Sequence, residues 1–274
     1  MPRATIRTQD WKSACRRSLR HFYDVRAVAL VLGVLLSGAV SAHGQNVLPP
    51  AGAASTFAPE IGAGSSPCKI IYLGFVGALE PPDNKYSGVV QIRDVLRGAG
   101  FGDVCASSYS PYVWTMGRDW LLKHFPAHDG VMTPAELLLC PKVILVGHSM
   151  GGWAMMSVAR ELRSRNIPVE LTIQVDSVGI TDQTVPRNVK NGALFHAHDV
   201  LMFMTTRHLK MEDPTMTKLV ANVTVAGAGH ESITRDPRIR ELVISTIERL
   251  RAGFLAPAMV ELPIPVEGGA AKAQ

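Results

Sequence analysis

Short apolar runs alternate with longer segments of helical spacing along the middle of the chain. Six short runs are strand candidates, at 69–73, 103–107, 143–146, 169–175, 193–196 and 222–226, and those at 69–73 and 143–146 have the apolar, β-branched composition of buried strands. The intervening segments predict helices at 87–98, 114–125 and 150–163, a short one from 133, and a last one from 237 to about 250. Strands separated by helices form a parallel sheet covered on both faces. We therefore expect a three-layer α/β domain with a mostly parallel sheet of about six core strands.

The segment 128–136 partly matches two unrelated motifs. Thr133 is suited to cap a helix that begins with proline and has glutamate at its third position. Three residues also match positions 5, 6 and 12 of an EF-hand calcium loop, namely Asp129, Gly130 and Glu136. Positions 1 and 3 would then fall on Phe125 and Ala127, whose side chains have no oxygen. The pattern favours a helix cap, and we expect neither a metal nor another cofactor.

The N-terminal 42 residues have the order of a secretory signal peptide. A basic stretch over 1–26 precedes a 14-residue apolar run at 27–40, and Val40 and Ala42 suit positions −3 and −1 of a cleavage site. An uncleaved signal anchor is the alternative, but a membrane span usually needs roughly 20 apolar residues. The sequence predicts cleavage after Ala42, no stable membrane span afterwards, and a periplasmic or secreted protein.

Composition divides the remaining chain into three parts. Residues 43–67 and 256–274 are rich in Ala, Gly and Pro and lack apolar periodicity, which is typical of a flexible lead-in and a disordered tail. Residues 68–255 are enough for one domain. The basic stretch at 1–26 accounts for the whole formal charge of +5, and from His43 onward 21 basic residues balance 21 acidic ones. The absence of net charge from His43 onward argues against nucleic-acid binding.

Three cysteines follow the predicted signal. Cys68 and Cys140 each precede an apolar run, so both would lie at the same end of the sheet if those strands are neighbours. A disulfide between Cys68 and Cys140 is then geometrically possible in an oxidising compartment. The alternative is two buried thiols, and at least one of the three cysteines, which include Cys105, stays unpaired within the chain.

The pentapeptide at 147–151, Gly-His-Ser-Met-Gly, lies between a predicted strand and a predicted helix. In that context G-x-S-x-G predicts a nucleophile elbow, a sharp turn that exposes the serine hydroxyl. The amino end of the helix adds positive potential where negative charge develops. Ser149 is therefore the candidate nucleophile. The backbone N–H of Met150, with that of Phe75 or Val76 after the first strand, is the candidate oxyanion hole.

A nucleophilic serine needs a base and an acid that orients the base. His230 lies on a glycine-rich loop just past the sixth strand, where a base can reach back to Ser149. The chain order Ser, acid, His leaves several carboxylates. Asp176 ends the fourth strand, Asp199 follows the fifth, and Asp182 lies between them. Geometry alone does not choose among these three.

The stretch from Leu73 to Ile239 resembles a group of bacterial α/β-hydrolases. The matching pieces are GFVG at 74–77, GHSMGG at 147–152, AREL at 159–162 with IP at 167–168, VDSV at 175–178 and VPRNV at 185–189; GHSMGG and VDSV are the specific ones. The resemblance implies an α/β-hydrolase fold and favours Asp176 as the acid. The segment 193–198, Ala-Leu-Phe-His-Ala-His, departs from the pattern of that group and keeps Asp199 as second choice.

These features predict an exported serine hydrolase that cleaves small carboxylic esters or thioesters through Ser149, His230 and Asp176. The spacing leaves no room for a large cap domain. Two segments with aromatic or methionine side chains, 108–120 and 201–204, could form an apolar wall for an acyl chain, although ordinary core packing is the commoner role of any single residue of this kind. An amidase or peptidase, or a non-catalytic binding protein with the same fold, is the alternative.

Overall fold

The computed structural model describes residues 68–125, 131–179, 181–198 and 205–255. The strands are β1 (Ile70–Phe75), β2 (Val104–Tyr109), β3 (Lys142–His148), β4 (Leu171–Val175), β5 (Thr184–Val185), β6 (Asn191–Ala197), β7 (Lys210–Met211) and β8 (Lys218–Val225). The helices are α3 (Gly88–Leu96), α4 (Trp114–Leu122), α5 (Pro134–Leu139), α6 (Met150–Ser164) and α7 (Pro237–Leu255), with 3₁₀ turns η2 (Pro111–Val113) and η3 (Ser232–Arg235). The predicted signal peptide, lead-in and tail lie outside the described residues.

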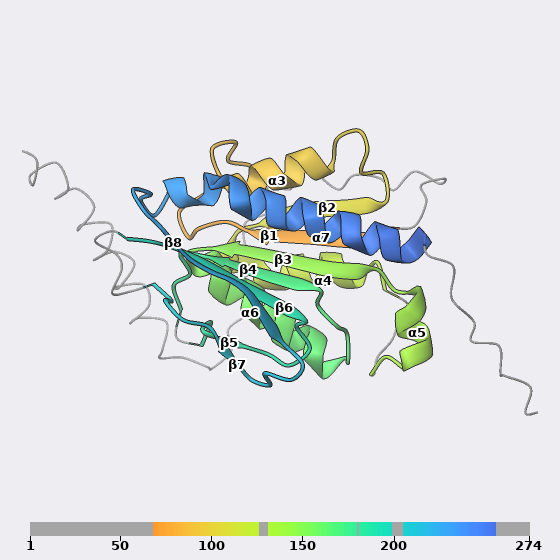
Figure 1. Cartoon of the computed structure of the whole chain (residues 1–274). Helices are drawn as coiled ribbons and strands as arrows, with labels where there is room; N and C mark the ends of the chain where they lie inside the picture. Colours follow the sequence, from red (N-terminus) through yellow and green to blue (C-terminus); the bar gives the residue numbers. More distant parts are fainter. Residues whose placement is uncertain (1–67, 126–130, 180, 199–204, 256–274) are drawn as a thin grey trace, which may run out of the picture. The chain divides into compact units, whose positions relative to one another are not determined.

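Six strands form one parallel sheet in the order β2-β1-β3-β4-β6-β8 (Figure 1). This confirms the predicted three-layer α/β-hydrolase fold. The sequence did not predict β5 and β7, which form a separate pair of two residues each. Within the described residues, the connections after β4 and β6 hold only this small pair and no cap domain. The helices of the described ranges are too short or too polar to cross a membrane.

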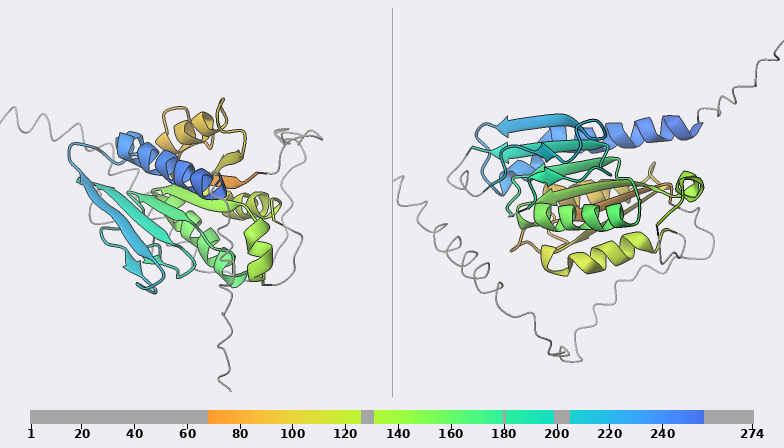
Figure 2. Two further views of the ribbon diagram at one scale, coloured as in Figure 1. Left: turned by 45° about the vertical axis from the view of Figure 1, so that its right-hand side comes forward. Right: turned by 90° about the horizontal axis from the view of Figure 1, so that it is seen from below.

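Helices cover both faces of the sheet because the strands are apolar on both sides. Alternate residues of β1 point to opposite faces: Tyr72 joins the apolar cluster beneath α3 and α7, whereas Leu73 joins the cluster against α4 and α6. Figures 1 and 2 show α3 and α7 on one side of the sheet and α4 and α6 on the other. The Tyr72 hydroxyl donates to the Val89 carbonyl at 2.9 Å, which satisfies the polar end of a fully buried ring.

The helix cap predicted at Thr133 is present. The Thr133 hydroxyl accepts a hydrogen bond from the Glu136 backbone N–H, and the Glu136 carboxylate accepts one from the Thr133 backbone N–H. The two bonds satisfy donors that would otherwise have no partner at the start of α5. Glu136 therefore acts as a capping residue, while 126–130, where the rest of the rejected calcium loop falls, lie outside the described residues.

The disulfide prediction was wrong in its pairing. The structure joins Cys68 to Cys105, with Cα atoms 5.6 Å apart, and leaves Cys140 as a buried free thiol. The sequence placed Cys68 beside β3, but β1 has a second neighbour, β2, which carries Cys105. The Cys140 side chain instead packs into the apolar cluster on the α4 and α6 face of the sheet.

Replacing both Cys68 and Cys105 with serine should lower the free energy of unfolding. Their sequence separation is 37 residues, and closing a loop of this length in the unfolded chain gives a stabilisation of about 4 kcal/mol in the chain-entropy model. Urea denaturation of the oxidised protein and the double variant measures the loss. Cys140→Ala, which keeps the disulfide, is the control, and a loss no larger than in this control would contradict the prediction.

Candidate active site

The parallel register brings the candidate residues to one edge of the sheet. His148 at the end of β3 is level with Val175 at the end of β4, so Ser149 and Asp176 are the next residues of two neighbouring strands. The backbone N–H of Ser149 donates to the Val175 carbonyl at 2.9 Å. Ligands of open α/β sheets bind at this carboxyl edge, where strands give way to loops and helices.

Ser149 has the strained backbone of a nucleophile elbow. Its φ of 53° and ψ of −128° lie in a region that residues with a side chain rarely adopt. The Ser149 carbonyl accepts hydrogen bonds from the backbone N–H groups of Gly152 and Val178, at 2.9 and 3.0 Å, which hold the turn in place. The side chain is half-buried at the start of α6, whose first N–H groups carry partial positive charge.

Glycine is required at two positions of the elbow. A Cβ at Gly147 would lie 2.7 Å from the Cα of Gly152 and closer still to Gly151, because strand and helix meet at an acute turn. A Cβ at Gly151 would lie 2.5 Å from the Val76 carbonyl oxygen. A side chain at Gly151 would therefore collide with the end of β1, and one at Gly147 with the helix of the elbow itself.

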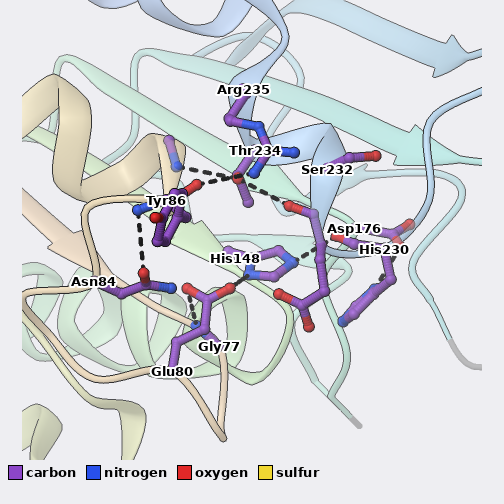
Figure 3. Close-up of polar contacts among 12 residues, drawn as sticks. Gly77, Glu80, Asn84, Tyr86, His148, Asp176, His230, Ser232, Thr234 and Arg235 are labelled. Carbon is purple, nitrogen blue, oxygen red and sulfur yellow. Dashed lines mark hydrogen bonds and ion pairs between the residues drawn. The ribbon is translucent and has the colours of Figure 1, made fainter. Parts of the chain in front are cut away.

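His230 is held by Asp176. Its Nδ1 lies 2.6 Å from Oδ2 of Asp176 (Figure 3). The Asp176 side chain is fully buried, and its other carboxylate oxygen accepts the Ala197 backbone N–H at 3.0 Å. An ionised carboxylate only accepts hydrogen bonds, so Nδ1 carries the proton in a neutral ring and Nε2 keeps its lone pair. The His230 side chain is 15% exposed. This tautomer is the one that a general base needs.

The backbone of Asp176 is also unusual, with a φ of 44°. Its N–H donates to the Phe195 carbonyl of β6 at 2.7 Å, so the residue turns away from β4 while still attached to the neighbouring strand. Aspartate tolerates the left-handed region better than most residues. The turn directs the carboxylate to the loop that follows β8, where His230 lies.

Of the other candidate acids, Asp199 lies outside the described residues, and Asp182 has different partners. The Ser177 hydroxyl donates to one Asp182 carboxylate oxygen, and the Thr206 hydroxyl donates to the other at 3.1 Å. Burial raises the pKa of Asp182, although these hydroxyls act in the opposite direction. Asp182 therefore ties together loops beside the candidate site.

Asp182→Asn should gain stability relative to the wild type as the pH rises above about 4. A carboxyl whose pKa is raised on folding favours the folded state below its unfolded pKa of about 3.9, and this contribution is lost as the pH passes the folded pKa. Asparagine has no such titration. Urea denaturation of both proteins at several pH values measures the difference, and a difference independent of pH would contradict the assignment.

The two N–H groups proposed for an oxyanion hole differ in how far the structure supports them. Met150 is the first residue of α6, so its N–H has no partner within the helix. The N–H of Val76 donates to the Tyr109 carbonyl at 3.1 Å and is therefore already engaged. Phe75 is the last residue of β1 and is paired with Tyr109 of β2 and Gly147 of β3, so it also belongs to the hydrogen-bonded sheet. The structure therefore does not distinguish Phe75 from Val76 as the second donor.

The predicted apolar wall is in part core. Trp114 packs edge-on against Trp153 with ring centroids 6.5 Å apart, and Trp120 packs against Tyr109 at 6.4 Å. Trp114, Trp120 and Tyr109 all adjoin the cluster beneath α4 and α6, so they stabilise the fold. Tyr112 is exposed. The second predicted segment, 201–204, lies outside the described residues.

Sequence reasoning missed a polar cluster that contacts the His230 loop. His148, the residue before Ser149, is fully buried, and its Nε2 lies 2.9 Å from the backbone carbonyl oxygen of His230. Its Nδ1 lies 3.1 Å from Oε1 of Glu80, in the loop after β1. Glu231 contacts the Glu80 carboxylate. His148 lies at a variable position of G-x-S-x-G, so the motif gave no signal for it.

The pKa values of the two glutamates in this cluster are shifted in opposite directions. Burial acts to raise the pKa of Glu80, but its contacts, first with His148 and then with Glu231 and Ser87, outweigh burial and lower that pKa to about 2. Burial and the nearby Glu80 carboxylate raise the pKa of Glu231. Two carboxyl groups in contact share a proton more readily than they ionise together.

Comparison with known proteins finds no matching family model and no matching curated protein. Solved structures do match. Est1E from Butyrivibrio proteoclasticus has a TM-score of 0.41 and 12% identity over 69% of this chain and 91% of its own. A dienelactone hydrolase from Anabaena variabilis has a TM-score of 0.39 and 15% identity, over 68% and 87% of the two chains. SrfTE, the thioesterase domain that cyclises the lipopeptide surfactin, has a TM-score of 0.39 and 12% identity, over 66% and 92%. Likenesses this distant carry no argument about what this chain acts on.

Proposed function

We propose that the chain is a serine hydrolase of carboxylic esters or thioesters, with Ser149 as nucleophile, His230 as base and Asp176 as the acid that orients it. The observation that carries the proposal is the contact of 2.6 Å between Asp176 and His230, at the sheet edge where Ser149 occupies a strained elbow. A buried carboxylate that orients a histidine, at the sheet edge that also carries such a serine, is the arrangement that a Ser-His-Asp triad requires.

In this mechanism the Ser149 Oγ attacks the acyl carbon while Nε2 of His230 takes the hydroxyl proton. Asp176 stabilises the imidazolium that results. The oxyanion of the tetrahedral intermediate accepts hydrogen bonds from the backbone N–H of Met150 and from that of Phe75 or the residue after it, near the positive end of α6. His230 returns the proton to the leaving alcohol or thiol, and water then releases the acyl group by the same route.

Hydrolysis of matched model substrates tests the proposed reaction. A p-nitrophenyl butyrate ester, a butyryl thioester and the corresponding p-nitroanilide present one acyl group with three leaving groups. We expect turnover of the ester or the thioester by the wild type and a slower rate on the anilide, with Ser149→Ala as the blank. Turnover of none of the three by folded protein, or a preference for the anilide, would contradict the proposal.

We also propose that the protein acts outside the cytoplasm, after cleavage of the signal predicted over 1–42. The support is the order of basic, apolar and small residues in that segment. Sequencing the N-terminus of protein recovered from the periplasmic and medium fractions of an expressing bacterium tests this. His43 as the first residue is the expected result, whereas an intact N-terminus in the cytoplasm or membrane would contradict it.

A further inference from the structure

Three potential metal ligands meet next to the candidate active site, and the reaction proposed above does not use them. They are Glu80, in the loop after β1; His148, at the end of β3; and Glu231, the residue after His230. One ligand atom from each lies within 4.8 Å of one from each of the others. His148 is fully buried and the Glu80 side chain is 9% exposed, whereas Glu231 is exposed. The cluster is therefore closed on the protein side and open to solvent through Glu231.

The hydrogen bonding of His148 leaves one nitrogen available as a ligand. Its Nε2 lies 2.9 Å from the His230 carbonyl oxygen, which only accepts, so Nε2 carries the proton. Nδ1 then either carries a second proton, which pairs with Glu80, or has a lone pair that can bind a cation. This buried atom makes no hydrogen bond with any part of the chain that the structure describes. A histidine that donates one N–H to a backbone carbonyl and presents its other nitrogen is the usual form of a metal-binding histidine.

The nearest neighbour of Nδ1 is a carboxylate oxygen. Oε1 of Glu80 lies 3.1 Å from Nδ1, within ion-pair distance. A positive charge therefore has to lie between the two atoms, either as a proton on Nδ1 or as a metal ion bound to both. Two zinc ligands at tetrahedral positions are separated by about 3.4 Å, given bond lengths of about 2.0–2.1 Å. The spacing of nitrogen and oxygen therefore approaches that of two ligands of one ion.

Glu231, the third ligand, adds a second carboxylate, and Gly77 leaves the space beside the imidazole ring without a side chain. Glu231 contacts the Glu80 carboxylate, so two carboxyl groups lie beside one imidazole. Beside the ring, Gly77 has no side chain; a Cβ there would lie 3.1 Å from Nδ1 and 3.6 Å from the carboxyl carbon of Glu80. A divalent cation would balance the two carboxylates.

We propose that Glu80, His148 and Glu231 bind one divalent transition-metal ion. Imidazole nitrogen with two carboxylate oxygens suits zinc, and three protein ligands leave a fourth position for water on the exposed side. The sequence predicted no metal because the ligands come from three separate segments and form no spacing motif. The bound ion links the loop after β1, the strand that ends in the elbow and the loop that carries His230. It stabilises this edge of the domain whether or not the proposed hydrolysis occurs.

Metal binding by chelator-treated protein tests the site. Isothermal titration with Zn²⁺, together with the visible absorption of bound Co²⁺, gives stoichiometry, affinity and ligand type. We expect one saturable ion per chain with a spectrum of nitrogen and oxygen ligands, and binding at least about 100-fold weaker in Glu231→Gln and Glu80→Gln. Glu248→Gln is the control, since Glu248 is also a glutamate and is exposed on α7. This variant should bind the metal ion as the wild type does.

Two results would overturn the proposal. One is the absence of saturable Zn²⁺ or Co²⁺ binding by the wild type. The other is equal binding by the wild type and Glu231→Gln, which would place any bound ion elsewhere, for example at His230 and Asp176. Because Glu231 is exposed, its replacement by glutamine is expected to fold, and circular dichroism of each variant verifies this. The titrations need no substrate, so failure of the proposed hydrolysis would leave their result unaffected.

Discussion

Asp176→Asn should lower kcat for the best ester or thioester about 10⁴-fold, as the corresponding change does in serine proteases. Asparagine can keep the hydrogen bond from the Ala197 N–H and tolerates the φ of 44° at this position. Its amide group, however, would donate to Nδ1 of His230. The imidazole proton would then move to Nε2, the nitrogen that has to take the proton from Ser149.

Steady-state kinetics of Asp176→Asn beside Asp199→Asn separates the two acids considered from the sequence. We expect KM to change little, because the acid does not contact the substrate, and Asp199→Asn to stay within about tenfold of the wild type in kcat. Equal unfolding midpoints show that each variant is folded. If Asp176→Asn kept a kcat near that of the wild type and Asp199→Asn lost most of its kcat, Asp199 would be the acid that orients His230.

Gly151→Ala should destabilise the domain by about 3 kcal/mol or more, at the upper end of what overpacking costs. The added methyl group would lie 2.5 Å from the carbonyl oxygen of Val76 and closer still to that of Phe75. Both are backbone atoms and cannot rotate away, so α6 has to move from the end of β1. That movement also separates Met150 from Phe75 and Val76, the two candidates for the second oxyanion donor.

Urea denaturation of Gly151→Ala and of Gly253→Ala measures this effect with a matched control. A Cβ at Gly253 in α7 meets no atom within 4 Å, and alanine favours the helix by up to about 1 kcal/mol over glycine. The control should therefore be neutral or slightly stabilising. If Gly151→Ala were as stable as this control, the close approach of α6 to β1 would not exist in solution.

Elements governed by local pattern could be predicted from the sequence. The β-branched run before Gly147 predicted β3, and the glycines of the pentapeptide predicted the elbow. Both predictions were possible because strand, turn and helix are consecutive in the chain. The strand β8 begins at Lys218, four residues before the predicted start at 222. The extra residues are mostly exposed at the edge of the sheet, so they lack the apolar signal of a buried strand.

Contacts between distant segments could not be predicted in the same way. Cys68 had two possible partners, and the choice depended on which strand flanked β1 and on which face Cys140 packed. The contact from His148 to the His230 backbone, like that from Glu80 to Glu231, joins loops that meet only after the sheet has formed. The proximity of Asp176 to His230 required the turn at Asp176, and local pattern gave no sign of its positive φ.

Labelling with a fluorophosphonate probe, followed by peptide mass spectrometry, tests the central claim most directly. The account predicts one phosphonyl group per wild-type molecule, located on Ser149, with labelling strongly slowed in His230→Ala and absent in Ser149→Ala. Folded wild-type protein that remains unlabelled, or that carries the label on a residue other than Ser149, would contradict the claim that Ser149 is an activated nucleophile.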